Sequence, residues 1–193
     1  SLMDDNIMET PLTGGPFTLE LREFYLFGTG SGNSSNNGMF LKDVLNSLID
    51  SVWIDNCGNF PIQVSSTSDV DIIQSRFVDN VSKISLSNNV DRCIIDNCYF
   101  KGNAGLVTMD RTDNSIVKSN RVLTSTAIAV DLSDDCNNCL ISDNFVSQST
   151  TAADCVFISA NSDSNIITDN TLHALVSTGK AINDTGTNTQ IGH

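Results

Sequence analysis

The feature that most constrains the fold is a short motif that recurs along almost the whole chain. "LISDNFV" at 140–146 and "IITDNTL" at 166–172 each have two aliphatic residues, a polar pair and an aromatic or aliphatic end. The second aliphatic residue of each copy falls at Leu21, Ile49, Ile73, Ile95, Val117, Ile141 and Ile167. The copies are about 24 residues apart, and a regular period of this length is the signature of a repeat architecture.

A second short apolar segment follows each motif after about eleven residues, as in "FPIQV", "GLVTM" and "CVFIS". Gly, Asn, Ser and Asp, which favour turns, lie between the segments. No stretch keeps a helical period over three turns. β-Branched columns joined by turns predict an all-β parallel β-helix of about seven coils, stacked at about 4.8 Å. We assign residues 17–193 to it and residues 1–16 to an irregular entry or cap.

The repeat also predicts which residues stack on one another. Asn120, Asn144 and Asn170 each follow their anchor by three places, so they should point inward and bond the turns above and below. Behind them, an apolar column is expected from Ile54, Val78, Phe100, Val122, Val146 and Leu172.

Composition limits the partners and the compartment. The chain has 10 Lys and Arg against 23 Asp and Glu, a net charge of −13. This balance disfavours nucleic acid and anionic membrane surfaces. No apolar run is long enough to cross a membrane, and the first residues do not resemble a signal peptide. The six cysteines are expected to be small core residues, because Cys136 and Cys139 form a single CxxC without a second pair.

The recurring unit I-I-x-D/S-N-x-V/F, together with "LELREFYLFGTGSGN" at 19–33, resembles the pectate-lyase-like right-handed parallel β-helices. The resemblance is strongest to phage tailspikes and NosD-like carbohydrate-binding repeats, and it covers about residues 17–193. It implies a right-handed helix, an extracellular or virion-surface location, and a polysaccharide as partner.

Enzymes of that superfamily provide catalytic patterns to test. The polygalacturonase pattern is matched only in part, by Thr112-Asp113 and Asp134-Asp135, and its Gly-His-Gly and Arg-Ile-Lys elements are absent. A pectate lyase would need a calcium-holding acidic cluster. Asp110, Asp134 and Asp135 are weak candidates for Ca²⁺ ligands, and the alternative is that they cap turns. No other cofactor is expected.

The predicted outward face suggests a different site. If the asparagine column points inward, the outward column carries aromatic and basic side chains, with Lys101 two places further on. Flat aromatic faces suit the C–H surfaces of sugars, and polar neighbours suit their hydroxyls. The predicted substrate-binding residues are Trp53, Phe77, Tyr99, Lys101, Arg121 and Phe145. Packing between subunits is the competing explanation for this aromatic column.

Asp55 and Asp79 are the candidate catalytic pair. They are expected one coil apart, about 5 Å between backbones, which is the separation of the two carboxyl groups in a retaining glycosidase. Repulsion between them would raise one pKa, as a general acid requires. The alternative is two solvated aspartates.

A further column, next to the anchors, predicts self-association. Its six members are Leu48, Ile72, Ile94, Ile116, Leu140 and Ile166. Both faces of this strand would then be apolar, and such a strand needs a cover. Tailspike-like relatives form trimers, so a homotrimer is expected.

These observations favour a carbohydrate-engaging module of a tailspike-like protein that binds or degrades a surface polysaccharide. One alternative is a purely structural trimeric fibre segment. Another is a polysaccharide lyase or glycoside hydrolase of the pectate-lyase-like superfamily.

Overall fold

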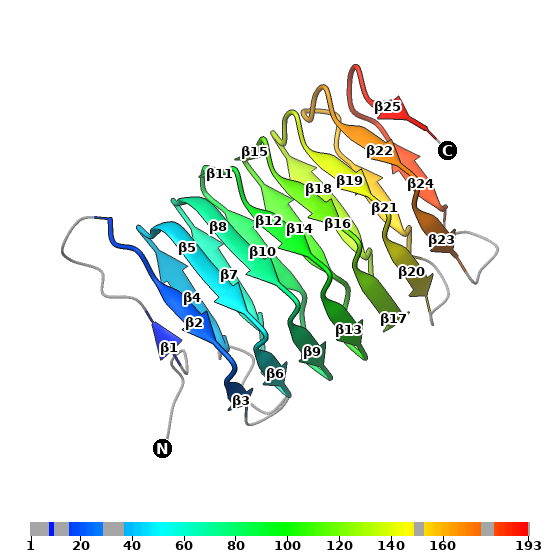
Figure 1. Cartoon of the computed structure of the whole chain (residues 1–193). Coiled ribbons are helices and arrows are strands. Elements are labelled where there is room, and N and C mark those ends of the chain that lie inside the picture. The colour runs from blue at the N-terminus through cyan, green and yellow to red at the C-terminus, as the bar shows by residue number, and fades with distance from the viewer. Residues whose placement is uncertain (1–7, 10–15, 29–36, 149–152, 175–179, 193) are drawn as a thin grey trace.

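The structure is a computed structural model that describes residues 8–9, 16–28, 37–148, 153–174 and 180–192. Within these ranges the chain forms strands and turns, without a helix. The strands pair in parallel and stack coil upon coil into three sheets along one axis (Figure 1). The predicted all-β parallel β-helix is therefore confirmed.

Successive coils contribute strands to all three sheets, and two coils give the β5 sheet a pair of short strands, β11 with β12 and β15 with β16. We name the sheets after the strands of one coil, β5, β6 and β7. The β5 sheet contains β2 (Glu20–Arg22), β5 (Leu45–Asp50), β8 (Ser68–Ile73), β11 (Val90–Asp91), β12 (Ile94–Asp96), β15 (Thr112–Asp113), β16 (Ile116–Lys118), β19 (Leu140–Ser142), β22 (Ile166–Thr168) and β25 (Gln190–Ile191). The β6 sheet contains β3 (Tyr25–Phe27), β6 (Trp53–Asp55), β9 (Arg76–Val78), β13 (Tyr99–Lys101), β17 (Arg121–Ser125), β20 (Phe145–Gln148) and β23 (Thr171–His173). The β7 sheet contains β1 (Met8–Glu9), β4 (Met39–Lys42), β7 (Ile62–Ser65), β10 (Ile84–Ser87), β14 (Val107–Asp110), β18 (Val130–Asp134), β21 (Val156–Ile158) and β24 (Ile182–Asp184).

The core lies between the three sheets, and each sheet contributes apolar side chains that stack in columns. Residues in register across neighbouring strands stack directly, so the columns run along the axis. The β5 sheet contributes Ile49, Ile72, Ile95, Val117, Ile141 and Ile167, all buried. The β7 sheet contributes Leu41, Val64, Leu86, Met109, Leu132 and Ile158, also buried.

The corners between sheets explain why the chain is rich in Asn, Asp and Ser. At the corner from the β5 sheet to the β6 sheet, one residue per coil has a positive φ: Ser51, Gln74, Asn97, Ser119, Asp143 and Asp169. Short polar side chains tolerate this left-handed conformation better than most others, because they can hydrogen-bond to the local backbone. The left-handed conformation at each corner therefore explains why Asn, Asp and Ser recur at these positions of the repeat.

The predicted asparagine column is confirmed as a buried hydrogen-bonded ladder at the same corner. Asn144 Nδ2 donates to the Val117 carbonyl at 2.9 Å and to Asn170 Oδ1 at 3.0 Å. Asn120 uses its own Nδ2 to reach the Ile95 carbonyl at 2.9 Å. Each amide thus ties one coil to the next and satisfies backbone groups at the bend.

The register of the third coil differs from the prediction by one residue. Ile72, not Ile73, pairs with Ile49 and Ile95, and Phe77, not Val78, pairs with Ile54 and Phe100. Phe77 is fully buried and stacks on Phe100, with ring centroids 4.8 Å apart. Its predicted outward, substrate-binding position is therefore wrong. The reason is that Asp71 occupies the outward place where the neighbouring copies have Leu48 and Ile94, so the adjacent Ile72–Ile73 pair matched the motif one place too late.

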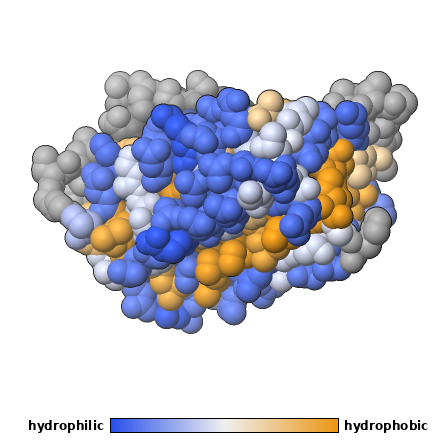
Figure 2. Space-filling view, turned by 90° about the horizontal axis from the view of Figure 1, so that it is seen from above, coloured by the Kyte–Doolittle hydropathy of each residue, from blue (hydrophilic) through white to orange (hydrophobic). Residues whose placement is uncertain are grey.

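The same shift corrects the apolar column on the outer face of the β5 sheet. Ile72 belongs to the core, and Asp71 takes its place between Leu48 and Ile94. The outer apolar column consists of Leu48, Ile94, Ile116, Leu140 and Ile166, each at least partly exposed. Figure 2 shows an apolar band crossing an otherwise polar surface.

The first residues add one observation to the predicted boundary at residue 16. Met8–Glu9 forms β1, which pairs with β4 and extends the β7 sheet by one strand. Residues 1–7 and 10–15 lie outside the described residues, as does most of "GTGSGN" at 28–33, so the 1–16 and 17–193 division stays a prediction.

Candidate functional site

The outer face of the β6 sheet carries a continuous column of large side chains, one from each strand. Parallel register sets their order, because each strand pairs residue for residue with the next. From the N-terminal end the column reads Tyr25, Trp53, Arg76, Tyr99, Arg121, Phe145 and Thr171. Trp53, Tyr99, Arg121 and Phe145 were predicted here, and the structure brings them together.

Neighbouring members of the column are in contact. The Tyr25 and Trp53 rings meet edge to face, with centroids 5.2 Å apart. The guanidinium of Arg76 lies 4.5 Å from the centroid of Trp53 and 5.0 Å from that of Tyr99. Arg121 lies over the Phe145 ring at 5.6 Å. Cation–π contacts of this kind hold the side chains in order while leaving them at the surface.

The solvent reaches these rings. Trp53 is 41% exposed and Tyr25 is 54% exposed, whereas Phe77 and Phe100 behind them are buried completely. The face is thus a stacking surface supported by a rigid core.

A second outward column runs beside the first, two residues further along each strand. It reads Phe27, Asp55, Val78, Lys101, Leu123, Ser147 and His173. The Tyr25 hydroxyl donates to Asp55 Oδ2 at 3.4 Å, and nearby Asp55 contributes, after desolvation, to a raised pKa of Tyr25. Lys101 is exposed in this column, where the sequence placed it.

The structure does not bring Asp79 opposite Asp55. Asp55 pairs with Val78, and Asp79 lies in the following turn with a φ of 52°. The Asp79 amide donates to the Lys101 carbonyl, just as the Asn56 amide donates to the Val78 carbonyl, so Asp79 is level with Asn56. The predicted placement of Asp55 and Asp79 as facing carboxylates was wrong for the same one-residue reason.

Sequence reasoning missed Tyr25 and Arg76. Tyr25 follows Leu21 by four places, as Trp53 follows Ile49, so the first copy already carried the signal. Arg76 was hidden because the shifted register put Phe77 in its position.

The weak calcium candidates lie at the corner between the β7 and β5 sheets, and each has a protein donor. Asp110 Oδ2 is 3.2 Å from Arg111 Nη2, Asp134 accepts from Asn161, and Asp135 accepts from Asn137. Among the described residues, no group of three His, Cys, Asp or Glu side chains is arranged to hold a metal ion.

The six cysteines are free thiols buried in the core. Burial raises the pKa of Cys57, Cys93, Cys98 and Cys139 to about 12, and that of Cys136 and Cys155 to about 11. Thiols with such pKa values stay protonated near neutral pH, so they are poor nucleophiles and poor metal ligands.

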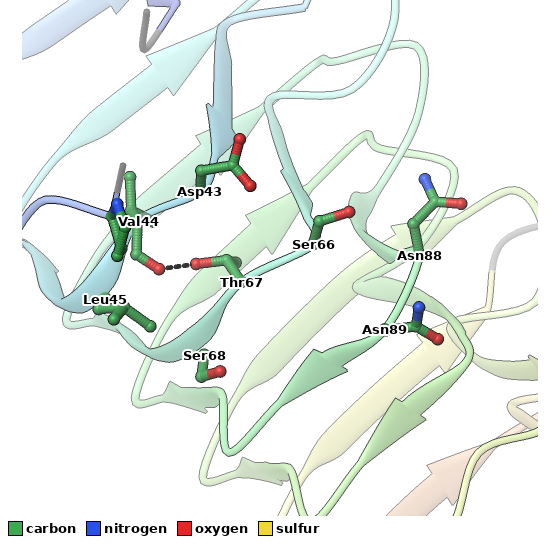
Figure 3. Close-up of a pocket in the computed structure, with 9 residues that line it drawn as sticks. Asp43, Val44, Leu45, Ser66, Thr67, Ser68, Asn88 and Asn89 are labelled. Carbon is green, nitrogen blue, oxygen red and sulfur yellow. Dashed lines mark hydrogen bonds between the residues drawn. The ribbon is translucent and has the colours of Figure 1, made fainter. Parts of the chain in front are cut away.

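One hollow of about 500 Å³ lies outside the β6 face, at the corner where the β7 sheet turns into the β5 sheet (Figure 3). Thr67 donates to the Val44 carbonyl in its wall. The lining combines hydroxyls and amides with the Asp43 carboxylate. It consists of Pro16, Asp43, Val44, Leu45, Ser66, Thr67, Ser68, Asn88 and Asn89. These groups can hydrogen-bond a small neutral polar molecule. The repeat pattern does not predict the hollow.

The arrangement defines a class of protein: a parallel β-helix with an exposed aromatic and basic column along one sheet. Residues 22–192 match the family described as "Periplasmic copper-binding protein (NosD)". The chain therefore belongs to the NosD family, a family of right-handed parallel β-helices.

No curated protein matches the chain. Among solved structures the chain is similar to QnrB1, a plasmid-mediated fluoroquinolone resistance protein, with 9% identity over 92% of this chain and 91% of that one. The TM-score of 0.25 is too low to support an argument. No described segment is a helix long and apolar enough to span a membrane.

The family description names copper, and the described residues do not fit that ion. Copper sites use thiolate, thioether and imidazole ligands. The thiols here are buried and protonated, Met39 and Met109 are fully buried in the core, and His173 stands on the surface beside Phe145. These donors do not meet at one place, so no step of the function is assigned to copper.

Proposed function

We propose that this chain is a polysaccharide-binding module and that the outer face of the β6 sheet is its binding surface. The observation that carries the proposal is the column from Tyr25 to Phe145, in which rings and guanidinium groups, each at least partly exposed, follow one another without a break. Aromatic faces stack on the C–H faces of sugars, and the neighbouring polar groups can bond their hydroxyls.

The solenoid suits an extended ligand. Successive strands are about 4.8 Å apart, and one pyranose residue of an extended chain advances by about the same distance. A glycan lying along the axis would therefore meet a new side chain with each sugar. Because the column rests on the buried Phe77 and Phe100, little ordering of the protein is needed on binding.

Binding is supported better than cleavage. The predicted pair of catalytic carboxylates depended on Asp79 facing Asp55, and the register places Val78 there. What remains on this face is a single carboxylate, Asp55, among stacking and basic side chains, which favours recognition.

The setting that fits this function is outside the cytoplasm. The family is described as periplasmic, and a tailspike-like protein would meet a surface polysaccharide in the same kind of environment. Six buried thiols with raised pKa values are compatible with an oxidising compartment, because the thiolate is the reactive species.

A glycan array followed by titration tests the proposal. Trp53→Ala and Tyr99→Ala should each weaken binding about fivefold, equivalent to about 1 kcal/mol for one lost stacking contact. Phe157→Ala is the matched control, since Phe157 is a half-buried aromatic residue on the β7 sheet. Unchanged affinity in both β6-face variants would remove this surface from consideration.

The structural fibre segment remains the second candidate, because one observation favours it. The outer apolar column of the β5 sheet leaves Leu48, Ile94, Ile116, Leu140 and Ile166 partly exposed. Such a surface fits packing against copies of the same chain in a homotrimer. The two functions are compatible, because the column and the binding surface belong to different sheets.

A further inference from the structure

From Trp53 to Phe145, the outward column of the β6 sheet alternates in chemical type from coil to coil, whereas at its N-terminal end the two rings of Tyr25 and Trp53 are neighbours. An aromatic ring on β6 is followed by a guanidinium on β9, a ring on β13, a guanidinium on β17 and a ring on β20. The five residues are Trp53, Arg76, Tyr99, Arg121 and Phe145. Positive charge therefore recurs at every second coil.

The two guanidinium groups in this column differ from the other three arginines of the chain. Arg22 pairs with Glu20 and Asp50, Arg92 pairs with Asp69 and Asp91, and Arg111 bonds Asp110 and Asn88. Within the described part of the chain, Arg76 and Arg121 form no ion pair and their guanidiniums contact aromatic rings instead. Lys101, in the adjacent outward column, likewise has no ion-pair partner among the described residues.

Stacking prepares these guanidiniums for an anion. Arg76 lies between two rings, which restrain the plane of its guanidinium group. Its N–H groups can still donate hydrogen bonds to a ligand. A guanidinium fixed in this way loses less freedom when it binds a carboxylate through two parallel hydrogen bonds. Neutral hydroxyls would use only part of this donor set.

The net charge of −13 does not prevent binding of an anion at this face. Exposed charges further apart than about 8 Å are largely screened at physiological ionic strength. On the face itself, Arg76, Lys101 and Arg121 stand against Asp55 in the two outward columns. Within these two columns, three positive side chains therefore stand beside one carboxylate, although the molecule as a whole is acidic.

From this pattern we infer that the polysaccharide bound here is anionic, with a carboxylate-bearing sugar alternating with a neutral one. The inference rests on the proposed function. Arg76 and Arg121 are two coils apart, or roughly 10 Å at the usual strand spacing, and two sugars of an extended chain span about that distance. The carboxylates would meet the two arginines, and the neutral sugars would stack on Trp53, Tyr99 and Phe145.

A panel of oligosaccharides of equal length tests the charge pattern. Hyaluronan oligosaccharides supply the alternating uronate, their carboxyl-reduced form is the matched neutral probe, and oligogalacturonate carries a charge on every sugar. The expected result is that the alternating probe binds at least tenfold more tightly than its carboxyl-reduced form and more tightly than oligogalacturonate. Raising the salt concentration should narrow the first difference.

Substitutions test whether the two arginines cause the preference for the alternating probe. Arg76→Gln and Arg121→Gln should each reduce the preference for the alternating probe over its carboxyl-reduced form, while Arg111→Gln, on another face, should leave it unchanged. If the alternating and carboxyl-reduced probes bind equally well, or if oligogalacturonate binds best, the inference is overturned and the proposed glycan binding stands. If no glycan binds, the proposed function fails and the inference fails with it.

Discussion

Asn144 accepts two hydrogen bonds from Asn120 through a single oxygen. Asn144 Oδ1 receives the Asn120 backbone N–H and the Asn120 Nδ2–H, both at 3.0 Å. Because Asn144 is 1% exposed, no solvent can replace these bonds if the side chain is changed.

Replacing Asn144 by Leu should therefore destabilise the fold. The substitution leaves the Asn120 amide and the Val117 carbonyl without their partner, at a cost of about 1–3 kcal/mol for each buried group. We expect a lower Tm by calorimetry and a lower urea midpoint. Ser147→Leu, on the outer face of the same coil, is the control and should change stability by about 0.5 kcal/mol or less. An unchanged Tm for Asn144→Leu would contradict the structural role of the ladder.

The cysteines should be chemically silent in the native protein. All six are buried and their pKa values are raised to about 11 or 12 by desolvation. We expect no reaction with a thiol reagent at pH 8 under native conditions and six reactive thiols after unfolding in urea. Rapid labelling of even one cysteine before unfolding would show that its corner opens locally.

The Asp71 carboxylate should make stability depend on pH. Its pKa is raised, first by burial and then by the nearby charge of Asp69. Folding thus favours the protonated form, so this contribution to stability is complete below the unfolded pKa and is lost as pH rises through the folded pKa. We expect Asp71→Asn to raise the Tm at pH 7 and to lose that advantage below about pH 4.

Asp163→Asn provides the opposite case. Hydrogen bonds from Asn188 and Thr187 lower the pKa of Asp163, so its contribution is present above the unfolded pKa and disappears as pH falls through the folded value. The variant should be slightly less stable than the wild type at pH 7 and equal to it in acid. Thermal melts at several pH values measure both, and parallel curves for both variants would refute the assignments.

The sequence predicts the solenoid well because its repeated signals are physical necessities of each coil. The inward aliphatic residue and the polar left-handed corner recur from coil to coil, and the inward asparagine recurs at Asn120, Asn144 and Asn170. Prediction fails at the third coil, where the outward residue is Asp71 and the corner uses Ser75 in place of asparagine, with the Val52 amide donating to Ser75 Oγ at 3.2 Å. Asp71 lies on the outer face of the sheet, whereas Ser75 is buried and satisfies backbone groups at the corner.

The candidate binding surface depends on that coil more than the fold does. A shift of one residue exchanges the two faces of a strand, so it placed Phe77 outside and concealed Arg76. The prediction of the fold is unaffected by the one-residue error, because Ile72, Ile73 and Phe77 are all apolar. The alternation of rings and guanidiniums, in contrast, is lost in the shifted register. Arg76 lies between Trp53 and Tyr99 only when Phe77 pairs with Ile54 and Phe100.

The last prediction concerns the outer apolar column of the β5 sheet, and it carries the proposal of a homotrimer. Leu48, Ile94, Ile116, Leu140 and Ile166 are partly exposed, and the Asp71 carboxylate interrupts them beside a hollow lined also by Asp69 and Arg92. Fully burying an aliphatic side chain contributes about 1.5–3 kcal/mol. Completing the burial of five half-covered ones contributes on the order of 5 kcal/mol per chain, comparable to the lower estimates of the entropy lost on association.

We therefore expect a trimer at micromolar concentration by sedimentation, and folded monomers when Ile94 and Ile116 are both changed to Asp. Ser147→Asp adds a charge to the β6 sheet and should leave the trimer intact. Asp71→Leu would close the gap in the column and should shift dissociation to lower concentration. A wild-type monomer would defeat the idea, and so would a double variant that unfolds, because both isoleucines point away from the core, whose adjacent positions are held by Ile95 and Val117.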